Sequence, residues 1–217
     1  MENDVKEFLS ELLKQLKSID YIKPEDIPNI DLYMDQVTTF MDEQLAASKR
    51  YESDKILTKT MINNYAKNNL LPSPDKKKYS KEHVLTLLFI YYFKNILSIN
   101  DIRSILNPLT EKYFGNDDGF TMQDVYTEVF SLEAEESQKL LKDLGKKYKI
   151  AGETFEDFPD EDQKFLHTFS FICMLSFDVY IKKMLIERMI DNLNEETEAS
   201  SHDNTHSGKE SKKTGSN

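Results

Sequence analysis

Amide and lysine side chains are the groups in this sequence whose type and spacing best suit a chemical task. Thr58 is a typical N-cap residue, and the chain after it predicts a helix through about Asn68. The apolar residues of this helix recur at helical spacing and should face inward: Met61, Ile62, Tyr65 and Ala66. The residues left outward carry no negative charge: Lys59, Thr60, Asn63, Asn64, Lys67 and Asn68. Asparagine can pair with adenine in the major groove and lysine can reach phosphates, so this face suits DNA.

A short basic loop follows this helix. Asn69 stands where a left-handed residue is favoured, and Pro72 and Pro74 prevent further helix. The lysines of the loop PSPDKKKYS could contact the DNA backbone, and each phosphate neutralised would steepen the salt dependence by roughly 0.9. The helix face and the loop together give the predicted DNA-binding residues: Lys59, Thr60, Asn63, Asn64, Lys67, Lys76, Lys77, Lys78 and Tyr79.

The distribution of charge singles out the same region. The chain of 217 residues has 28 basic and 39 acidic side chains, and its net charge of −11 argues against nucleic acid as a partner. Residues 55–83, however, hold seven basic and two acidic side chains, which gives +5. The flanking segments 1–54 and 84–194 each carry −7. One short basic window therefore stands in an otherwise acidic protein.

The remaining polar residues do not assemble into an enzymatic set. His83 is expected on a helix surface near the basic loop, where its protonated form could touch a phosphate, and His167 is expected to pack at a helix edge. Cys173 lies in the apolar string FSFICMLSF, which predicts a buried thiol. Residues 116–119 resemble a calcium loop but lack its first and last ligands. We expect a protein that is not an enzyme, without catalytic residues, cofactor or metal site.

Helices must position these groups, because glycine and proline are scarce and alternating β-branched patterns are rare. Residues 80–95 are apolar on all sides, which predicts a central, buried helix. Residues 46–57 could extend the preceding helix or form a loop. The expected helices comprise residues 3–17, 35–45, 58–68, 80–95, 98 to just before Pro108, 122–144 and 160–193. The sequence therefore predicts an all-α fold.

Four segments follow from this pattern: an N-terminal helix and connector at 1–26, a central domain at 27–114, a C-terminal helical part at 115–194 and a tail at 195–217. The tail lacks large apolar residues, so we expect it to be disordered. The longest apolar run, residues 84–93, is too short to span a bilayer. A single cysteine fits a reducing compartment, so the expected location is the cytoplasm, with no membrane as a partner.

The stretch INNYAKNNLLPSPDKKKYSKEHVLTLLFI, followed by SINDIRSIL, resembles the DNA-binding domain of the MerR family of transcription regulators. In that family a recognition helix leads into a Gly-Leu-Leu-Pro step, a basic wing and a Tyr-Ser-helix. The residues at matching positions are Tyr65, Leu70, Leu71, Pro72, Tyr79, Ser80, Val84, Ile90, Ile102 and Leu106. The resemblance implies a MerR-like winged helix-turn-helix module packed with additional C-terminal helices, and double-stranded DNA as the partner.

The sequence departs from the MerR pattern at several functional positions. The recognition-helix arginine is Asn63, the glycine before the leucines is Asn69, and the wing arginine is Lys77. Residues 27–114 also resemble a bacterial family known as domain of unknown function 1836, which implies a shared fold and brings no activity with it.

Two hypotheses remain open from the sequence. The first is a DNA-binding regulator whose C-terminal helices serve dimerisation or sensing, with a homodimer as the usual form of such proteins. The second is a protein-interaction module that keeps the winged-helix scaffold without binding DNA. The basic window favours the first hypothesis, and the acidic flanks favour the second.

Overall fold

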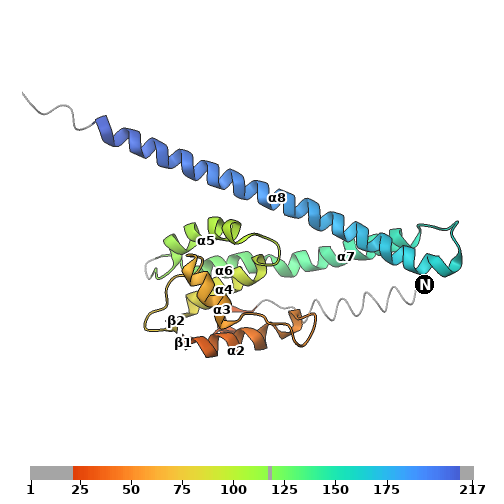
Figure 1. Cartoon of the computed structure of the whole chain (residues 1–217), viewed down its shortest axis with the longest axis horizontal. Coiled ribbons are helices and arrows are strands. Elements are labelled where there is room, and N and C mark those ends of the chain that lie inside the picture. The colour runs from red at the N-terminus through yellow and green to blue at the C-terminus, as the bar shows by residue number, and fades with distance from the viewer. Residues whose placement is uncertain (1–21, 117–118, 211–217) are drawn as a thin grey trace, which may run out of the picture.

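The computed structural model describes residues 22–116 and 119–210 and is mostly helical (Figure 1). The predicted helix at 3–17 lies outside the described residues. The helices are α2 (Met34–Gln44), α3 (Lys59–Lys67), α4 (Lys81–Phe93), α5 (Ile99–Tyr113), α6 (Met122–Ser131), α7 (Glu133–Gly152) and α8 (Asp160–Glu210). Shorter elements are the 3-10 turns η1 (Pro24–Asp26) and η2 (Ala46–Ser48) and the strands β1 (Leu32–Tyr33) and β2 (Lys78–Tyr79). The expected all-α class is confirmed, and η2 shows that residues 46–57 leave the preceding helix.

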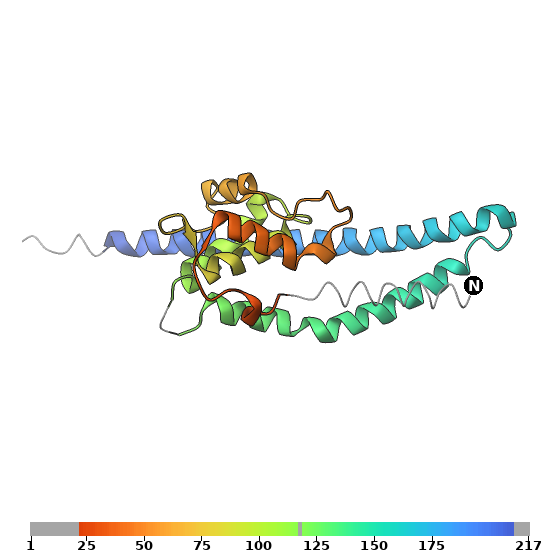
Figure 2. The ribbon, with the colours of Figure 1, turned by 90° about the horizontal axis from the view of Figure 1, so that it is seen from below.

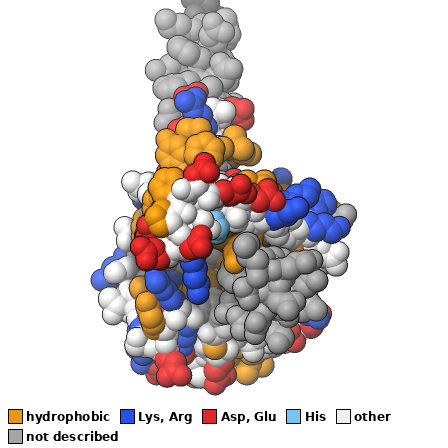
Figure 3. Space-filling view, turned by 90° about the vertical axis from the view of Figure 1, so that its right-hand side faces the viewer, with side chains coloured by type: hydrophobic (Ala, Val, Ile, Leu, Met, Phe, Trp, Pro, Cys, Tyr) orange, Lys and Arg blue, Asp and Glu red, His pale blue; other side chains and the backbone are white. Residues whose placement is uncertain are grey.

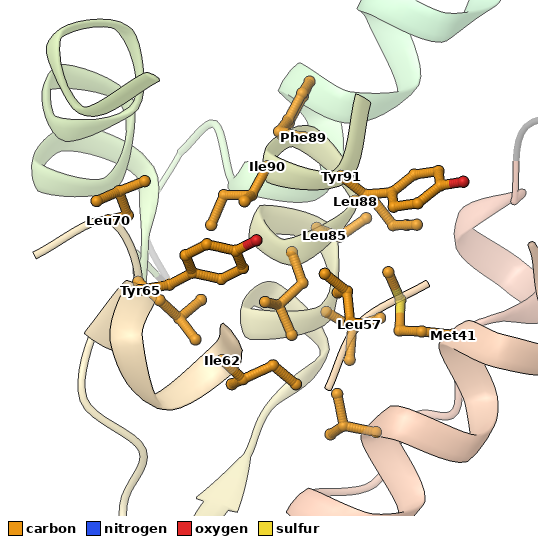
Figure 4. Close-up of a cluster of buried hydrophobic side chains, with 14 of the residues drawn as sticks. Met41, Leu57, Ile62, Tyr65, Leu70, Leu85, Leu88, Phe89, Ile90 and Tyr91 are labelled. Carbon is orange, nitrogen blue, oxygen red and sulfur yellow. The ribbon is translucent and has the colours of Figure 1, made fainter. Parts of the chain in front are cut away.

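Helix α4 forms the centre of the body, as its all-round apolar sequence predicts. Nine consecutive residues, 83–91, are buried, and the helix contacts α5, α6 and β2. Ile62 and Tyr65 of α3 point toward α4 in the close-up of this core (Figure 4). Because α4 is covered on every side, the elements around it have fixed positions relative to one another.

Local capping signals set the starts of the surrounding helices. The Ser98 hydroxyl accepts from the Asp101 N–H at 3.2 Å, and the Asp101 carboxylate accepts from the Ser98 N–H at 3.1 Å. Thr121 and Asp124 form the same reciprocal pair at the start of α6. Each such cap stabilises its helix by about 1 kcal/mol. The predicted starts of these helices are confirmed.

Helices α7 and α8 form a long antiparallel hairpin that extends away from the body (Figures 1 and 2). After the turn, α8 runs back alongside α7, contacts α5 and continues beyond the body. Cys173 lies on the exposed surface of α8, so the predicted burial of this thiol is wrong. Its apolar neighbours in sequence are distributed all round the helix, and α7 packs on one side of it. An apolar string alone does not reveal which of its residues a neighbouring helix will cover.

Three of the expected helices differ from the prediction in their boundaries. Pro108 lies inside α5, where Leu106 is fully buried and holds the helix to the core, and the Thr110 hydroxyl donates to the Leu106 carbonyl at 3.1 Å. The expected helix at 122–144 is two helices that meet at Leu132, because α6 packs on the core and α7 packs on α8. Helix α8 continues past the expected end near Leu193 to Glu210, through most of the segment predicted as a disordered tail. No glycine or proline interrupts residues 160–207, so the backbone meets no break there.

Candidate nucleic-acid interface

Helix α3 presents a polar face to solvent. Its N-cap Thr58 accepts a hydrogen bond from the Met61 N–H at 3.2 Å, and Ile62 and Tyr65 anchor the opposite face in the core. The residues predicted to face outward are all exposed, and we call them the α3 ridge: Lys59, Thr60, Asn63, Asn64, Lys67 and Asn68. The ridge holds two cations and three amides and no carboxylate, which suits contacts to phosphates and base edges.

The end of α3 sets the direction of the chain that follows. Asn69 has a φ of 58°, and it is followed by Leu70, whose N–H donates to the Tyr65 carbonyl at 2.9 Å. The Asn69 N–H donates to the Ala66 carbonyl at 3.2 Å. These two bonds form the Schellman motif that ends a helix at a left-handed residue, which confirms the role predicted for Asn69. The buried Leu70 then ties the start of the basic loop to the core.

The basic loop contains a tight hairpin turn formed by residues 75–78. The Lys78 N–H donates to the Asp75 carbonyl at 2.7 Å, and the two residues between them, Lys76 and Lys77, have φ values of 47° and 67°. Positive φ at both central positions defines a type I′ turn, in which Asn-Gly is the favoured pair. We call residues 72–79 the wing. Lys76, Lys77 and Lys78 are all exposed on it, as predicted.

A two-stranded sheet joins the wing to the body. Strand β2 pairs antiparallel with β1, with Leu32 opposite Tyr79 and Tyr33 opposite Lys78. The Lys78 ammonium lies 5.7 Å from the centre of the exposed Tyr33 ring, a cation–π contact. Strand β1 was not among the predicted elements, because a strand of two residues has no periodicity to detect.

One side chain links α2 to the ridge. Asp35, two residues after Tyr33, forms an ion pair with Lys59 at the start of α3. Helix α2 therefore lies close to both α3 and strand β2, although these elements are far apart in the sequence. The pair also offsets the charge of one ridge lysine. Neither Tyr33 nor Asp35 was among the predicted residues, since only the fold brings them to this surface.

The structure corrects the prediction for Tyr79. Its side chain is buried, and its ring meets the His83 ring edge-on at 5.5 Å between centres. Strand alternation explains the difference, because Lys78 points outward and the next residue must point inward. Burial raises the pKa of the Tyr79 phenol. Tyr79 therefore holds the base of the wing and offers no side-chain contact to a ligand.

His83 is also buried rather than on the helix surface. Its Nδ1 accepts from the Ser80 N–H at 3.0 Å, so the imidazole completes the N-terminal cap of α4. The Phe114 ring lies edge-on to it at 4.7 Å. Burial holds the pKa of His83 below its ordinary value, which keeps the ring neutral at pH 7. A phosphate contact by His83 is excluded by this position.

Other candidate chemistry gains no support from the part of the chain that the structure describes. No group of three His, Cys, Asp or Glu side chains there could hold a metal ion. His167 is half-buried, with its Nε2 2.8 Å from the Thr154 carbonyl oxygen, in the packing role predicted for it. Within residues 22–116 and 119–210, no helix combines the length and the apolar character needed to cross a membrane.

Residues 22–129 match the family model described as Domain of unknown function (DUF1836). This segment is a DUF1836 domain. The match confirms the resemblance predicted for residues 27–114 and reaches further at both ends. The Tyr126 hydroxyl of α6 donates to the Ile22 carbonyl at 2.8 Å, so the two ends of the DUF1836 domain are joined in the core. No curated protein and no solved structure matches the chain.

Proposed function

We propose that the DUF1836 domain of this chain binds double-stranded DNA through the α3 ridge and the wing, in the manner of a MerR-like winged helix-turn-helix regulator. The ridge would enter the major groove, where Asn63 and Asn64 can contact base edges. Lys67 and the wing lysines would contact phosphates on either side. Such a role is that of a cytoplasmic regulator of transcription.

The backbone conformation of the wing turn is the observation that best supports this proposal. Lys76 and Lys77 both adopt left-handed backbone conformations, which disfavour any residue with a β-carbon by roughly 1 kcal/mol or more. Asparagine and glycine would form the same turn with less strain, so stability does not explain two lysines there. Their side chains are exposed and make none of the ion pairs of the described residues, which leaves both charges available to a polyanion. Strained residues of this kind are typical of functional positions.

The rival hypothesis, a protein-interaction module without DNA binding, has an observation of its own. Asp35 pairs with Lys59, and Asp75 precedes the wing lysines, so carboxylates border the basic surface. These acidic groups would repel phosphates and would suit a mixed-charge protein partner instead. The basic side chains of the wing outnumber its single carboxylate by three to one, and for this reason DNA is the better candidate.

Fluorescence anisotropy with mixed genomic DNA fragments, at about 50 and about 200 mM salt, tests the proposal. We expect wild-type protein to bind at low salt and to weaken strongly at high salt. Lys76→Glu/Lys77→Glu should lose most of this binding. The matched control is Lys142→Glu/Lys146→Glu, which makes the same change in net charge at exposed positions of α7. Equal losses in both double variants, or no binding by wild-type protein at low salt, would overturn the proposal and favour the protein-interaction module.

A further inference from the structure

Helix α8 carries an apolar stripe on the side turned away from α7. The contact with α7 is marked by Phe171, whose ring meets Tyr148 at 5.2 Å, and by Asp178, which pairs with Lys147. On the other side, Phe165, Phe169, Ile172 and Val179 are each between 51% and 70% exposed. Other exposed apolar side chains of α8, such as Phe177 and Leu185, lie outside this stripe. A continuous run of large apolar side chains along one exposed face is nevertheless a mark of an interaction surface. Figure 3 shows hydrophobic side chains at the surface below the undescribed end of α8, bordered by acidic and basic groups.

The spacing of this stripe is that of a helix seam. We define the α8 seam as Phe165, Phe169, Ile172, Ser176, Val179 and Lys183. Successive members are separated by four, three, four, three and four residues, which is the alternation of a coiled coil. The pattern reads the same in both directions, so the seam can pack on a reversed copy of itself.

The charges at the two ends of the seam favour an antiparallel pair of α8 helices over a parallel pair. Glu161 and Asp162 precede the first seam residue, and Lys183 is the last one. A parallel pair of helices would bring like charges together at both ends. An antiparallel pair with the two seams matched end to end brings each Lys183 within about one helical turn of Glu161 and Asp162 of the other helix, and it also places Glu187 opposite Glu161.

We propose that a second copy of this chain packs antiparallel on the α8 seam to form a two-fold symmetric homodimer. Ile172 then lies opposite the partner's Ser176, where the small side chain leaves room for the large one. Phe169 lies opposite the partner's Val179. A two-fold axis makes these contacts occur twice, as an isologous interface requires. The proposal does not rest on DNA binding, because it follows from the exposed residues of α8 alone.

The size of the surface is sufficient for a specific dimer. Each exposed seam side chain, together with the flanking Tyr180, would bury on the order of 100 Å². Counted over two copies, the total is on the order of 1,000 Å², which is near the lower bound for a specific interface. The seam ends at Lys183, and farther along the helix Ile190 is buried in the core of the body.

Light scattering coupled to size-exclusion chromatography tests the dimer. Wild-type protein at micromolar concentration should elute with twice the 25.4 kDa mass of one chain. Phe169→Glu should give a monomer, whereas Phe177→Glu should leave the dimer intact, because Phe177 is a phenylalanine of α8 that lies outside the seam and is somewhat more exposed than Phe169. Both residues are exposed in the single chain, so helix content by circular dichroism should not change. A monomeric wild-type protein, or equal effects of the two variants, would overturn the proposal.

A charge-swap pair tests the antiparallel direction. Asp162→Lys and Lys183→Glu should each weaken self-association, and mixing the two variants should restore it, with the mixed dimer favoured over either homodimer by ~10-fold. Lys183 also pairs with Glu187 of its own chain, so recovery on mixing, rather than the single losses, is the decisive result. No recovery on mixing would contradict the antiparallel arrangement.

Chemical cross-linking tests which part of α8 lies at the two-fold axis. Cys173 is the chain's single cysteine and lies exposed beside the centre of the seam. A short bis-maleimide should therefore link two chains in high yield. A failure to cross-link would overturn the proposed register.

Sedimentation with phospholipid vesicles tests the other occupant that an exposed apolar face could have. A wild-type monomer that sediments with the vesicles would overturn the dimer and assign the seam to a lipid surface.

Discussion

Helices α3 and α8 each keep one long face that the body leaves uncovered, and the two faces differ in chemistry. The α3 ridge consists of amides and lysines, which water solvates well, so it can remain exposed at little cost in free energy. The α8 seam consists largely of phenylalanine, isoleucine and valine, whose exposure to water is unfavourable. A polar face of this kind suits a transient complex. An apolar face suits a permanent complex, such as one with a second copy of the chain.

The largest expected effect is the loss of folding stability when a ring on the buried side of α3 is removed, compared with a ring on the exposed side of α8. Tyr65→Ala removes a buried aromatic ring from the core, so we expect the free energy of unfolding to fall by roughly 3–5 kcal/mol. Phe165→Ala should change the stability of the monomer far less, because that ring is 70% exposed. Urea denaturation of both variants in the Phe169→Glu background, where the chain is expected to be monomeric, measures this difference. Equal losses would contradict the described packing.

A second substitution pair asks whether the α3 ridge reads bases. Asn63→Ala should weaken binding to a preferred DNA sequence by roughly 1–3 kcal/mol and leave binding to other sequences nearly unchanged. Lys77→Ala should weaken binding to every sequence alike, because a phosphate contact carries no sequence information. Anisotropy with a selected and a scrambled duplex separates the two. If both variants lost the same affinity for both duplexes, Asn63 would contact the DNA backbone rather than base edges.

The pH dependence of the free energy of unfolding tests the burial of His83, which packs beside the wing. Burial lowers the pKa of His83 in the folded chain, and the backbone of Ser73 and the charge of Asp31 oppose this more weakly, so the unfolded chain binds the proton first as the pH falls. Stability should be full above about pH 6.5 and should fall below it by up to about 1.4 kcal/mol per pH unit, until the folded chain is protonated too. His83→Gln keeps a side-chain acceptor for the Ser80 N–H and should remove this contribution. An unchanged pH profile in His83→Gln would contradict the assignment.

The smallest effect concerns the wing turn. Lys76→Asn/Lys77→Gly should stabilise the folded chain by about 1 kcal/mol, because both new residues tolerate positive φ better than lysine. Thermal unfolding measures the change. A loss of stability would show that the two lysines make stabilising contacts that outweigh the backbone strain.

Features set by a few neighbouring residues could be predicted from the sequence. The caps at Thr58, Ser98 and Thr121 and the left-handed Asn69 each depend on contacts within one helical turn. The apolar composition of residues 84–91 likewise predicted the buried α4. In these cases the local preference and the tertiary structure agree, so a sequence pattern is sufficient.

Features that depend on distant neighbours could not be predicted. His83 sits in a polar stretch beside the wing, and its burial depends on Phe114, which approaches from the end of α5. Tyr33 and Asp35 join the candidate surface because β1 pairs with β2, and Cys173 is exposed because α7 covers the other side of α8. The strain at Lys76 and Lys77 was also invisible, since the residue types do not indicate a type I′ turn.

The salt dependence of DNA affinity tests the central claim most directly. For wild-type protein and Lys76→Asn/Lys77→Gly, the slope of log affinity against log salt concentration should be measured on one duplex. Each phosphate contact contributes roughly 0.9 to this slope, so the variant should show a slope smaller by about 1.8 while remaining at least as stable as wild type. An identical slope in the two proteins, or no measurable affinity in either at low salt, would contradict a DNA-binding wing.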